Sequence, residues 1–160
     1  MCTHKARAVM TKYFDLRPQG ILSCQILIDD HRVTRISLGL VAPSSIRGRS
    51  ISPKKELLEL LSGHPPFTIS FSHYTPFQKK VLAAVQGVEF GTTATYADIA
   101  KSVGCKSPRA VGMALAANNT PLLIPCHRIV RKDGNIGGFS QGIEVKRLLL
   151  RFEDENRRNE

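Results

Sequence analysis

One tetrapeptide of this sequence carries the residue types best suited to chemistry, Pro125-Cys126-His127-Arg128. A cysteine reacts as its thiolate, and an imidazole or a cation beside it lowers the thiol pKa from its ordinary value of about 8.5. Adjacent residues of an extended strand point to opposite sides, so contact between this thiol and the next imidazole requires a bend or a bridging water. Pro125 favours such an irregular backbone. A buried cysteine beside a surface histidine is the commoner arrangement, so the tetrapeptide by itself leaves both interpretations open.

The other cysteines offer no comparable setting. The chain has four cysteines, and no two of them form the Cys-x-x-Cys pair of zinc ribbons and thioredoxin-like sites. Cys2, His4, Cys24 and His31 contain the atoms for a metal site, but Cys24 alternates with apolar residues as a buried strand thiol does. We therefore expect free thiols, no structural metal and no cofactor.

A small α/β unit is predicted for the first 72 residues. Alternation of apolar and polar residues indicates strands over 21–28, 33–40 and 67–71. Ser52-Pro53 has the residue types of a helix N-cap and first turn, and the Gly and Pro residues of 63–66 end that helix. Its apolar face is formed by Leu57, Leu58 and Leu61.

Helical spacing replaces this alternation in the second half of the chain. Apolar residues recur over 77–88, and Gly91 is expected to end that helix. Ile129-Val130 reads as a strand that enters a hairpin turn at 132–135 and returns at Ile136. A last helix begins near Ile143 and is expected to bury Leu148, Leu149 and Phe152.

Two further helices lie between these elements. Thr95 and Asp98 fit a capping box for a short helix, and Ser107-Pro108 starts another helix after a turn at Gly104. A short helix, a glycine turn and a second helix are typical of a helix-turn-helix, in which Arg109 would face DNA. Two helices that only pack together would have the same spacing.

Charge and composition narrow the class of partner. The 160 residues are 42% hydrophobic and carry a formal net charge of +10, which excludes a mostly disordered chain. No apolar run approaches the roughly 18 residues of a membrane span, and the N-terminus lacks the apolar core of a secretory signal. We expect a cytoplasmic protein, associated with the nucleoid or nuclear in a eukaryote, with no membrane partner. The basic residues of 97–132 favour a nucleic acid, although solvated Lys and Arg faces give the same composition.

The segment from Thr75 to Glu153 resembles the O6-alkylguanine-DNA alkyltransferases, also called methylated-DNA–protein-cysteine methyltransferases. The resemblance rests on Pro-Cys-His-Arg-Ile-Val at 125–130, the helix-turn-helix before it and a glutamate after it, in the family's order and spacing. Further matching residues are Asn118, Pro121, Gly137, Ser140 and Lys146. The resemblance implies a ribonuclease-H-like α/β N-terminal domain (a small sheet with a helix) over 1–72. It implies a mostly α C-terminal domain with a winged helix-turn-helix over 73–160.

The resemblance also implies catalytic roles. Cys126 matches the acceptor of the alkyl group, His127 the histidine that relays the thiol proton through a water, and Glu153 the carboxylate that orients it. Asn118 matches the asparagine that ties the recognition helix to the active-site segment, and Tyr96 the tyrosine that donates to guanine N3.

A second group of residues is implied to hold the DNA. Guanine O6 inside a duplex is out of reach of a thiolate, so the nucleotide must be extruded, and Arg109 matches the arginine that fills the gap. The other expected DNA contacts are Tyr96, Ser107 and Arg128. The base pocket is implied to be lined by Ile129, Val130, Phe139, Ser140 and Gln141. Gln141 stands where some relatives have glycine, and we expect it to narrow the pocket mouth against bulky alkyl groups.

The expected activity is irreversible, single-turnover transfer of an alkyl group to Cys126 from double-stranded DNA that contains O6-alkylguanine. O4-alkylthymine is a further candidate substrate, and we expect a monomer. Two other functions stay open: a non-catalytic helix-turn-helix protein that binds alkylated DNA, and a plain helix-turn-helix regulator. Cys126 argues against the first, and the regulator has no use for Asn118 or Glu153. A thiol hydrolase would need a Gly-rich oxyanion loop, which the sequence lacks.

Overall fold

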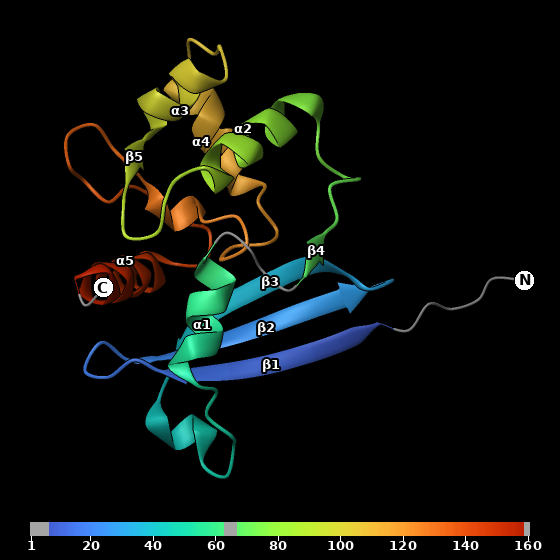
Figure 1. The fold of residues 1–160 in the computed structure, drawn as a ribbon, viewed down its shortest axis with the longest axis vertical. Coiled ribbons are helices and arrows are strands. Elements are labelled where there is room, and N and C mark those ends of the chain that lie inside the picture. The colour runs from blue at the N-terminus through green and yellow to red at the C-terminus, as the bar shows by residue number, and fades with distance from the viewer. Residues whose placement is uncertain (1–6, 63–66, 159–160) are drawn as a thin grey trace, which may run out of the picture.

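The computed structural model describes residues 7–62 and 67–158. Its N-terminal half is built on a mixed four-stranded sheet in the order β1-β2-β3-β4, in which β1, β2 and β3 are antiparallel and β4 runs parallel to β3 (Figure 1). The strands are β1 (Ala8–Asp15), β2 (Ile21–Asp29), β3 (Arg32–Val41) and β4 (Thr68–Ile69). A 3-10 turn, η1 (Pro43–Ile46), follows β3, and the helix α1 (Lys54–Leu61) lies across one face of the sheet.

The C-terminal half is mostly helical. Its elements are α2 (Pro76–Gln86), β5 (Ala94–Thr95), α3 (Tyr96–Ser102), α4 (Pro108–Ala116), the 3-10 turn η2 (Cys126–Arg128), β6 (Ile129–Val130) and α5 (Ile143–Arg157). The capping box of Thr95 and Asp98 begins α3, and the Ser107 hydroxyl accepts the Ala110 N–H at the start of α4. These caps satisfy N–H groups that the helices themselves leave free, so α3 and α4 begin where the sequence predicts.

Two hydrophobic clusters hold the molecule together, and the first joins its two halves. The alternating inner residues of β2 and β3 pack with the apolar face of α1 and with that of α5, which comes from the other end of the chain. This cluster includes Leu22, Ile26, Ile36, Leu57, Leu61, Leu148, Leu149 and Phe152. The second cluster joins α2, α3 and α4 to the segment that ends in β6. Anything carried by α5 is therefore fixed against the N-terminal sheet.

Most predicted elements are present, but several differ from the prediction. The sequence pattern missed β1, an edge strand whose residues, except Phe14, stay at least partly exposed and so alternate weakly. The first C-terminal helix ends at Gln86 rather than at Gly91, and the predicted strand at 67–71 shortens to β4. No strand returns at Ile136, because β6 pairs in parallel with the distant β5. Within the described residues, no helix combines the length and the apolar character needed to cross a membrane.

Candidate active site

The reactive tetrapeptide forms a tight turn rather than a strand. Pro125 precedes η2, and within the turn the Arg128 N–H donates to the Pro125 carbonyl at 3.0 Å. Such a turn rotates successive side chains by about a third of a revolution, so Cys126, His127 and Arg128 enter different surroundings, and all of them are buried. This is the bend that the sequence requires if the thiol and the imidazole are to work together.

Cys126 lies at a cavity of about 220 Å³ between α4 and the segment after β6. The cavity is lined by Tyr96, Gly112, Leu115, Ala116, Cys126, Gly138, Phe139 and Ser140. Phe139 and Ser140 are thus where the sequence places them. Gly112, Leu115 and Ala116 were missed, although their i, i+3, i+4 spacing marks one face of α4.

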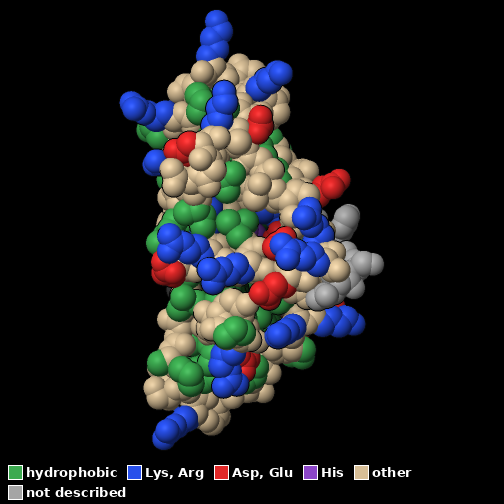
Figure 2. Space-filling view, turned by 90° about the vertical axis from the view of Figure 1, so that its left-hand side faces the viewer, with side chains coloured by type: hydrophobic (Ala, Val, Ile, Leu, Met, Phe, Trp, Pro, Cys, Tyr) green, Lys and Arg blue, Asp and Glu red, His purple; other side chains and the backbone are tan. Residues whose placement is uncertain are grey.

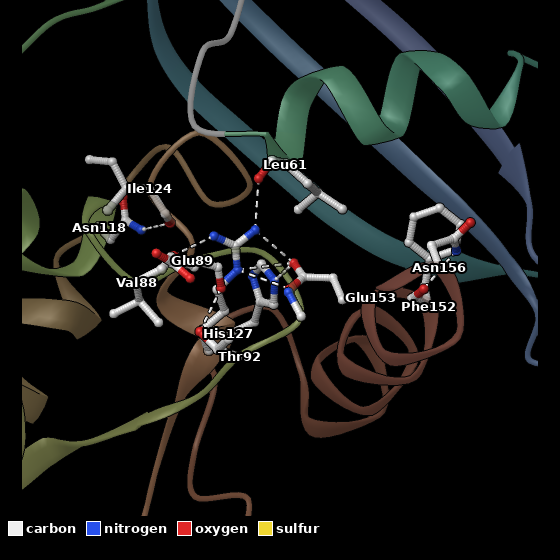
Figure 3. Close-up of polar contacts among 12 residues, drawn as sticks. Leu61, Val88, Glu89, Thr92, Asn118, Ile124, His127, Phe152, Glu153 and Asn156 are labelled. Carbon is white, nitrogen blue, oxygen red and sulfur yellow. Dashed lines mark hydrogen bonds and ion pairs between the residues drawn. The ribbon is translucent and has the colours of Figure 1, made fainter. Parts of the chain in front are cut away.

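Asn118 connects the sulfur to the surrounding backbone. Its Nδ2 donates to Cys126 Sγ at 3.1 Å and to the Ile124 carbonyl at 3.0 Å, and its Oδ1 accepts the Thr120 N–H at 3.0 Å. Figure 3 shows the Asn118 side chain turned toward Ile124. Burial raises the pKa of Cys126 to about 11, although the Asn118 hydrogen bond and the Lys146 charge oppose the rise. The thiol is therefore protonated near neutral pH and must pass its proton to another group before it can react.

His127, the residue after Cys126, forms a buried pair with Glu153. His127 Nε2 lies 2.6 Å from Glu153 Oε1 (Figure 3). Burial alone would raise the pKa of Glu153, but hydrogen bonds from His127 and Arg128 outweigh it and lower that pKa. An ionised carboxylate only accepts, so Nε2 carries the proton of this bond. Burial lowers the pKa of His127, so the ring is neutral and its Nδ1 has a free lone pair. No described residue hydrogen-bonds to Nδ1.

Arg128 binds the protein and not the solvent, so its predicted contact with DNA is wrong. Only 2% of its surface is exposed. Its Nε and Nη2 donate to Glu153, Nη1 donates to the Val88 carbonyl at 2.7 Å, and Nη2 also donates to the Leu61 carbonyl at 2.7 Å. Figure 3 shows Leu61, Val88 and Glu153 arranged around this group. Arg128 therefore supplies the counter-charge that keeps Glu153 ionised, and it joins the site to the end of α1.

Lys146 is a buried cation to which the sequence analysis assigned no role. Its Nζ donates to the Ile129 carbonyl at 2.5 Å and to the Gly138 carbonyl at 3.3 Å. Burial lowers the pKa of Lys146 to about 8, and the Cys126 charge opposes this shift. The signal that could have identified it is a lysine on the apolar face of α5, between Val145 and Leu148.

Three predicted pocket residues do not line the cavity. Ile129 belongs to the second hydrophobic cluster, and Val130 lies in β6 next to it. Gln141 turns toward the N-terminal sheet, where its Oε1 accepts the Leu38 N–H at 2.9 Å. The expectation that Gln141 narrows the pocket mouth is therefore wrong.

A wider groove opens from the cavity along α3 and α4. It encloses about 620 Å³ and includes Tyr96, Arg109, Met113, Arg131 and Lys132 in its lining. Ser107 is exposed at the start of α4, beside Arg109 in its first turn. Gly137 has a φ of 72°, and a Cβ there would lie 3.2 Å from Tyr96 Oη, so this position favours glycine on both counts.

Basic side chains surround this groove. Figure 2 shows Lys and Arg side chains projecting from the end of the molecule that carries α3 and α4. The exposed basic residues of this part of the chain are Lys101, Lys106, Arg109, Arg131 and Lys132. Of the basic residues predicted from 97–132, only Arg128 faces inward.

No metal site is found among residues 7–62 and 67–158: no three His, Cys, Asp or Glu side chains gather there. Cys2 and His4 lie outside the described residues, and Cys24 is buried in β2, where burial raises its pKa to about 12. The expectation of no structural metal stays a prediction.

Comparison with known proteins identifies relatives of this site. The sequence profile of the 6-O-methylguanine DNA methyltransferase DNA-binding domain matches residues 76–155. The methylated-DNA–protein-cysteine methyltransferase of Methanocaldococcus jannaschii is 52% identical over 89 residues, which are 55% of this chain and 52% of that protein. The matching chain segment spans about half the length of such curated relatives.

Solved structures extend the likeness to the whole fold. The O6-methylguanine-DNA methyltransferase of Pyrococcus kodakaraensis is 31% identical, with a TM-score of 0.73, over 91% of this chain and 99% of that chain. Mycobacterium tuberculosis OGT, crystallised in complex with DNA, is 26% identical, with a TM-score of 0.63, over 91% of this chain and 92% of that one.

Proposed function

Because the chain belongs to the 6-O-methylguanine DNA methyltransferase family, we propose that it repairs alkylated DNA by taking the alkyl group of O6-alkylguanine onto Cys126. The observation that carries this proposal is the position of Cys126: it lies at the cavity, and its sulfur accepts a hydrogen bond from the amide nitrogen of Asn118. A non-catalytic DNA-binding protein has no need of a cavity-lining thiol that is hydrogen-bonded in this way. The ribonuclease-H-like N-terminal domain over 1–72 and the winged helix-turn-helix over 73–160 are part of the proposal.

The reaction begins with the proton of the Cys126 thiol. His127 is neutral and its Nδ1 lone pair is free, whereas its Nε2 is held by Glu153. The thiol proton passes to Nδ1, through a water as the family resemblance implies, and the Glu153 carboxylate stabilises the imidazolium that results. The Asn118 N–H donor and the Lys146 ammonium stabilise the thiolate.

The thiolate then attacks the carbon bonded to guanine O6. The new S–C bond forms as the C–O bond breaks, and the electron pair of that bond leaves with guanine. Tyr96, whose pKa is raised by burial and which therefore keeps its proton, donates that proton to guanine N3. The product is a thioether at Cys126. Among the described cysteines, Cys24 is buried in the sheet and Cys105 lies in the turn between α3 and α4, so neither is placed to remove the alkyl group. Single turnover is part of the proposal.

We propose double-stranded DNA as the partner of the groove beside the cavity. Tyr96 lines both the groove and the cavity at Cys126, whereas Arg109 lines the groove alone, together with the exposed basic residues Arg131 and Lys132. An extruded nucleotide enters the cavity while the Arg109 guanidinium stacks in the gap that it leaves. Mycobacterium tuberculosis OGT, a relative with this fold, crystallised with DNA.

Intact-mass measurement tests the proposal. The protein is incubated with a duplex that contains one O6-methylguanine, and peptide mapping follows. We expect a gain of one methyl group per molecule, located on Cys126, and no gain for Cys126→Ser or with unmodified duplex. Binding of the methylated duplex without a mass gain would favour the non-catalytic alternative. Sequence-dependent binding without a mass gain would favour the regulator.

A further inference from the structure

The segment 70–75 crosses from the sheet to the helical half of the molecule, between β4 and α2 (Figure 1). Tyr74 lies near its end and is almost fully buried, with 5% of its surface exposed. Its ring belongs to the second hydrophobic cluster, and it contacts the rings of Phe71 and His73 at centroid distances of 5.9 and 4.1 Å. A buried phenol usually has a hydrogen-bond partner, and the partner of this phenol lies beside the active site.

The Tyr74 hydroxyl binds the residue that follows Asn118. It accepts the backbone N–H of Asn119 at 2.9 Å. The carbonyl of Asn119 accepts the Ile36 N–H of β3 at 2.7 Å, and its side-chain Nδ2 lies 3.2 Å from His73 Nε2. The backbone of Asn119 is therefore fixed on one side by the N-terminal sheet and on the other by the segment that leads into α2.

The chain between Asn118 and Cys126 depends on such contacts because its backbone is strained. Leu122 has a φ of 75°, which lies in the left-handed region that is unfavourable for a residue with a Cβ. A strained conformation of this kind persists only where the surrounding structure imposes it. The Leu122 side chain is buried in the first hydrophobic cluster. Contacts from outside the segment, rather than its own backbone preference, therefore determine its shape.

The side chain of Asn118 links this segment to the sulfur. Its Oδ1 accepts the Thr120 N–H at 3.0 Å, and its Nδ2 donates both to the Ile124 carbonyl at 3.0 Å and to Cys126 Sγ at 3.1 Å. Thr120 directly follows the fixed residue Asn119, so a shift of that backbone moves a partner of the Asn118 amide. Because hydrogen bonds weaken steeply with poor geometry, such a shift weakens the bond to the sulfur.

We propose that Tyr74 is a positioning residue for the nucleophile: its hydroxyl fixes the backbone of Asn119 and so keeps the Asn118 amide within hydrogen-bond distance of the sulfur. This inference rests on the proposed function, because it concerns the thiol of that reaction. Burial raises the pKa of Tyr74, so the phenol is neutral near pH 7. Tyr74→Phe therefore removes a hydrogen-bond acceptor without removing a charge, and a change in the ionisation of Cys126 reports on the amide.

The variants separate this role from a general effect on the fold. Tyr13→Phe is the matched control, because Tyr13 Oη also accepts a hydrogen bond, from Arg49 Nη1 at 2.9 Å, but on β1 at the far edge of the sheet from β4. Asn118→Ala removes the amide through which Tyr74 is proposed to act. The double variant Tyr74→Phe/Asn118→Ala then tests whether Tyr74 has any effect once that amide is gone.

Alkylation of Cys126 by iodoacetamide between pH 7 and 9, followed by peptide mapping, measures the thiolate without DNA. We expect its rate to fall roughly 3- to 10-fold in Tyr74→Phe, the range that one lost hydrogen bond gives. Methyl transfer from an O6-methylguanine duplex should slow by a similar factor. Both rates should stay within about twofold of the wild type in Tyr13→Phe. In the Asn118→Ala background, Tyr74→Phe should change neither rate by more than about twofold. Near-UV circular dichroism verifies that each variant is folded in the assay.

The outcomes distinguish this inference from the function on which it rests. An unchanged alkylation rate in Tyr74→Phe overturns the positioning role. A further loss as large in the Asn118→Ala background as in the wild type also overturns it, because Tyr74 then acts by another route. If the wild type transfers no methyl group while the alkylation rates behave as expected, the proposed function is overturned, whereas the link from Tyr74 to the thiol is supported.

Discussion

The amide nitrogen of Asn118 lies 3.1 Å from the sulfur of Cys126, and the same nitrogen also donates to the Ile124 carbonyl. The nucleophile is therefore held by the side chain that follows α4 and not only by its own turn. Because a hydrogen bond to the charged form lowers a pKa, this contact makes the thiolate of a deeply buried cysteine attainable.

Asn118→Asp removes this donor and places a negative charge near the sulfur, while an oxygen remains for the Thr120 N–H. We expect the pKa of Cys126 to rise and alkyl transfer to slow by roughly 10- to 100-fold, as for the loss of a hydrogen bond to a charged group. The pH profile of Cys126 alkylation by iodoacetamide measures the pKa. Thr120→Val, which removes only a hydroxyl that contacts Asn118 Oδ1, is the control. An unshifted profile in Asn118→Asp would contradict this role.

The stability of the protein should depend on pH through Cys126. Burial raises the pKa of this thiol to about 11, whereas an unfolded cysteine titrates near 8.5. Between these pH values the folded state keeps a proton that the unfolded state loses. The contribution of the Cys126 thiol to the free energy of unfolding is therefore fully present below about pH 8.5 and is lost as the pH rises toward 11. Relative to Cys126→Ala, the wild type should lose about 3 kcal/mol of unfolding free energy over this range.

Urea unfolding of both proteins at several pH values measures this difference. Cys24 is present in both proteins, so its own titration cancels. A constant difference between pH 8 and pH 11 would mean that the thiol ionises as easily in the folded state as in the unfolded one.

Glu153→Gln should destabilise the protein because it leaves the Arg128 charge buried without its partner. Both groups are almost fully inaccessible, with 2% and 1% of their side chains exposed. Breaking such a pair costs about 3–5 kcal/mol, whereas removing both charges is often neutral. We therefore expect the double variant Arg128→Met/Glu153→Gln to be more stable than Glu153→Gln in thermal or urea unfolding.

The rates of alkyl transfer in the same variants should not follow the order of their stabilities. The double variant regains stability but not activity, because His127 still lacks an anionic partner for the imidazolium. If the double variant instead recovers wild-type transfer rates, Glu153 acts only through the fold.

Arg109→Ala tests extrusion of the nucleotide. Arg109 is exposed in the groove, in the first turn of α4, and flipping a base costs a few kcal/mol. We expect repair in duplex DNA to slow by roughly 10- to 1,000-fold, with little change toward free O6-methylguanine, which needs no extrusion. Tyr96→Phe removes the proton donor and should slow both reactions. Arg35→Ala, at an exposed arginine of the sheet, is the control, and equal losses of Arg109→Ala on both substrates would rule out stacking.

The sequence predicted the elements that depend on local signals better than the side-chain positions that depend on partners far away in the chain. The starts of α3 and α4 follow from capping residues within one turn of each helix, and the strands β2 and β3 follow from their alternation. Arg128 was misjudged because one of its partners, Leu61, lies 67 residues away in the chain. Gln141 was misjudged for the same reason, since a strand edge and not a neighbour in sequence takes its side chain.

The docking of α5 on the sheet also sets the order in which the site is completed during synthesis. A ribosome delivers the chain from its N-terminus at about 5–20 residues per second, so Cys126 and His127 emerge seconds before Glu153. Until α5 has formed and packed against β3, the imidazole has no carboxylate and Arg128 has no counter-charge. In a nascent chain His127 and Arg128 therefore lack their carboxylate, and the helix that completes the core also completes this buried group.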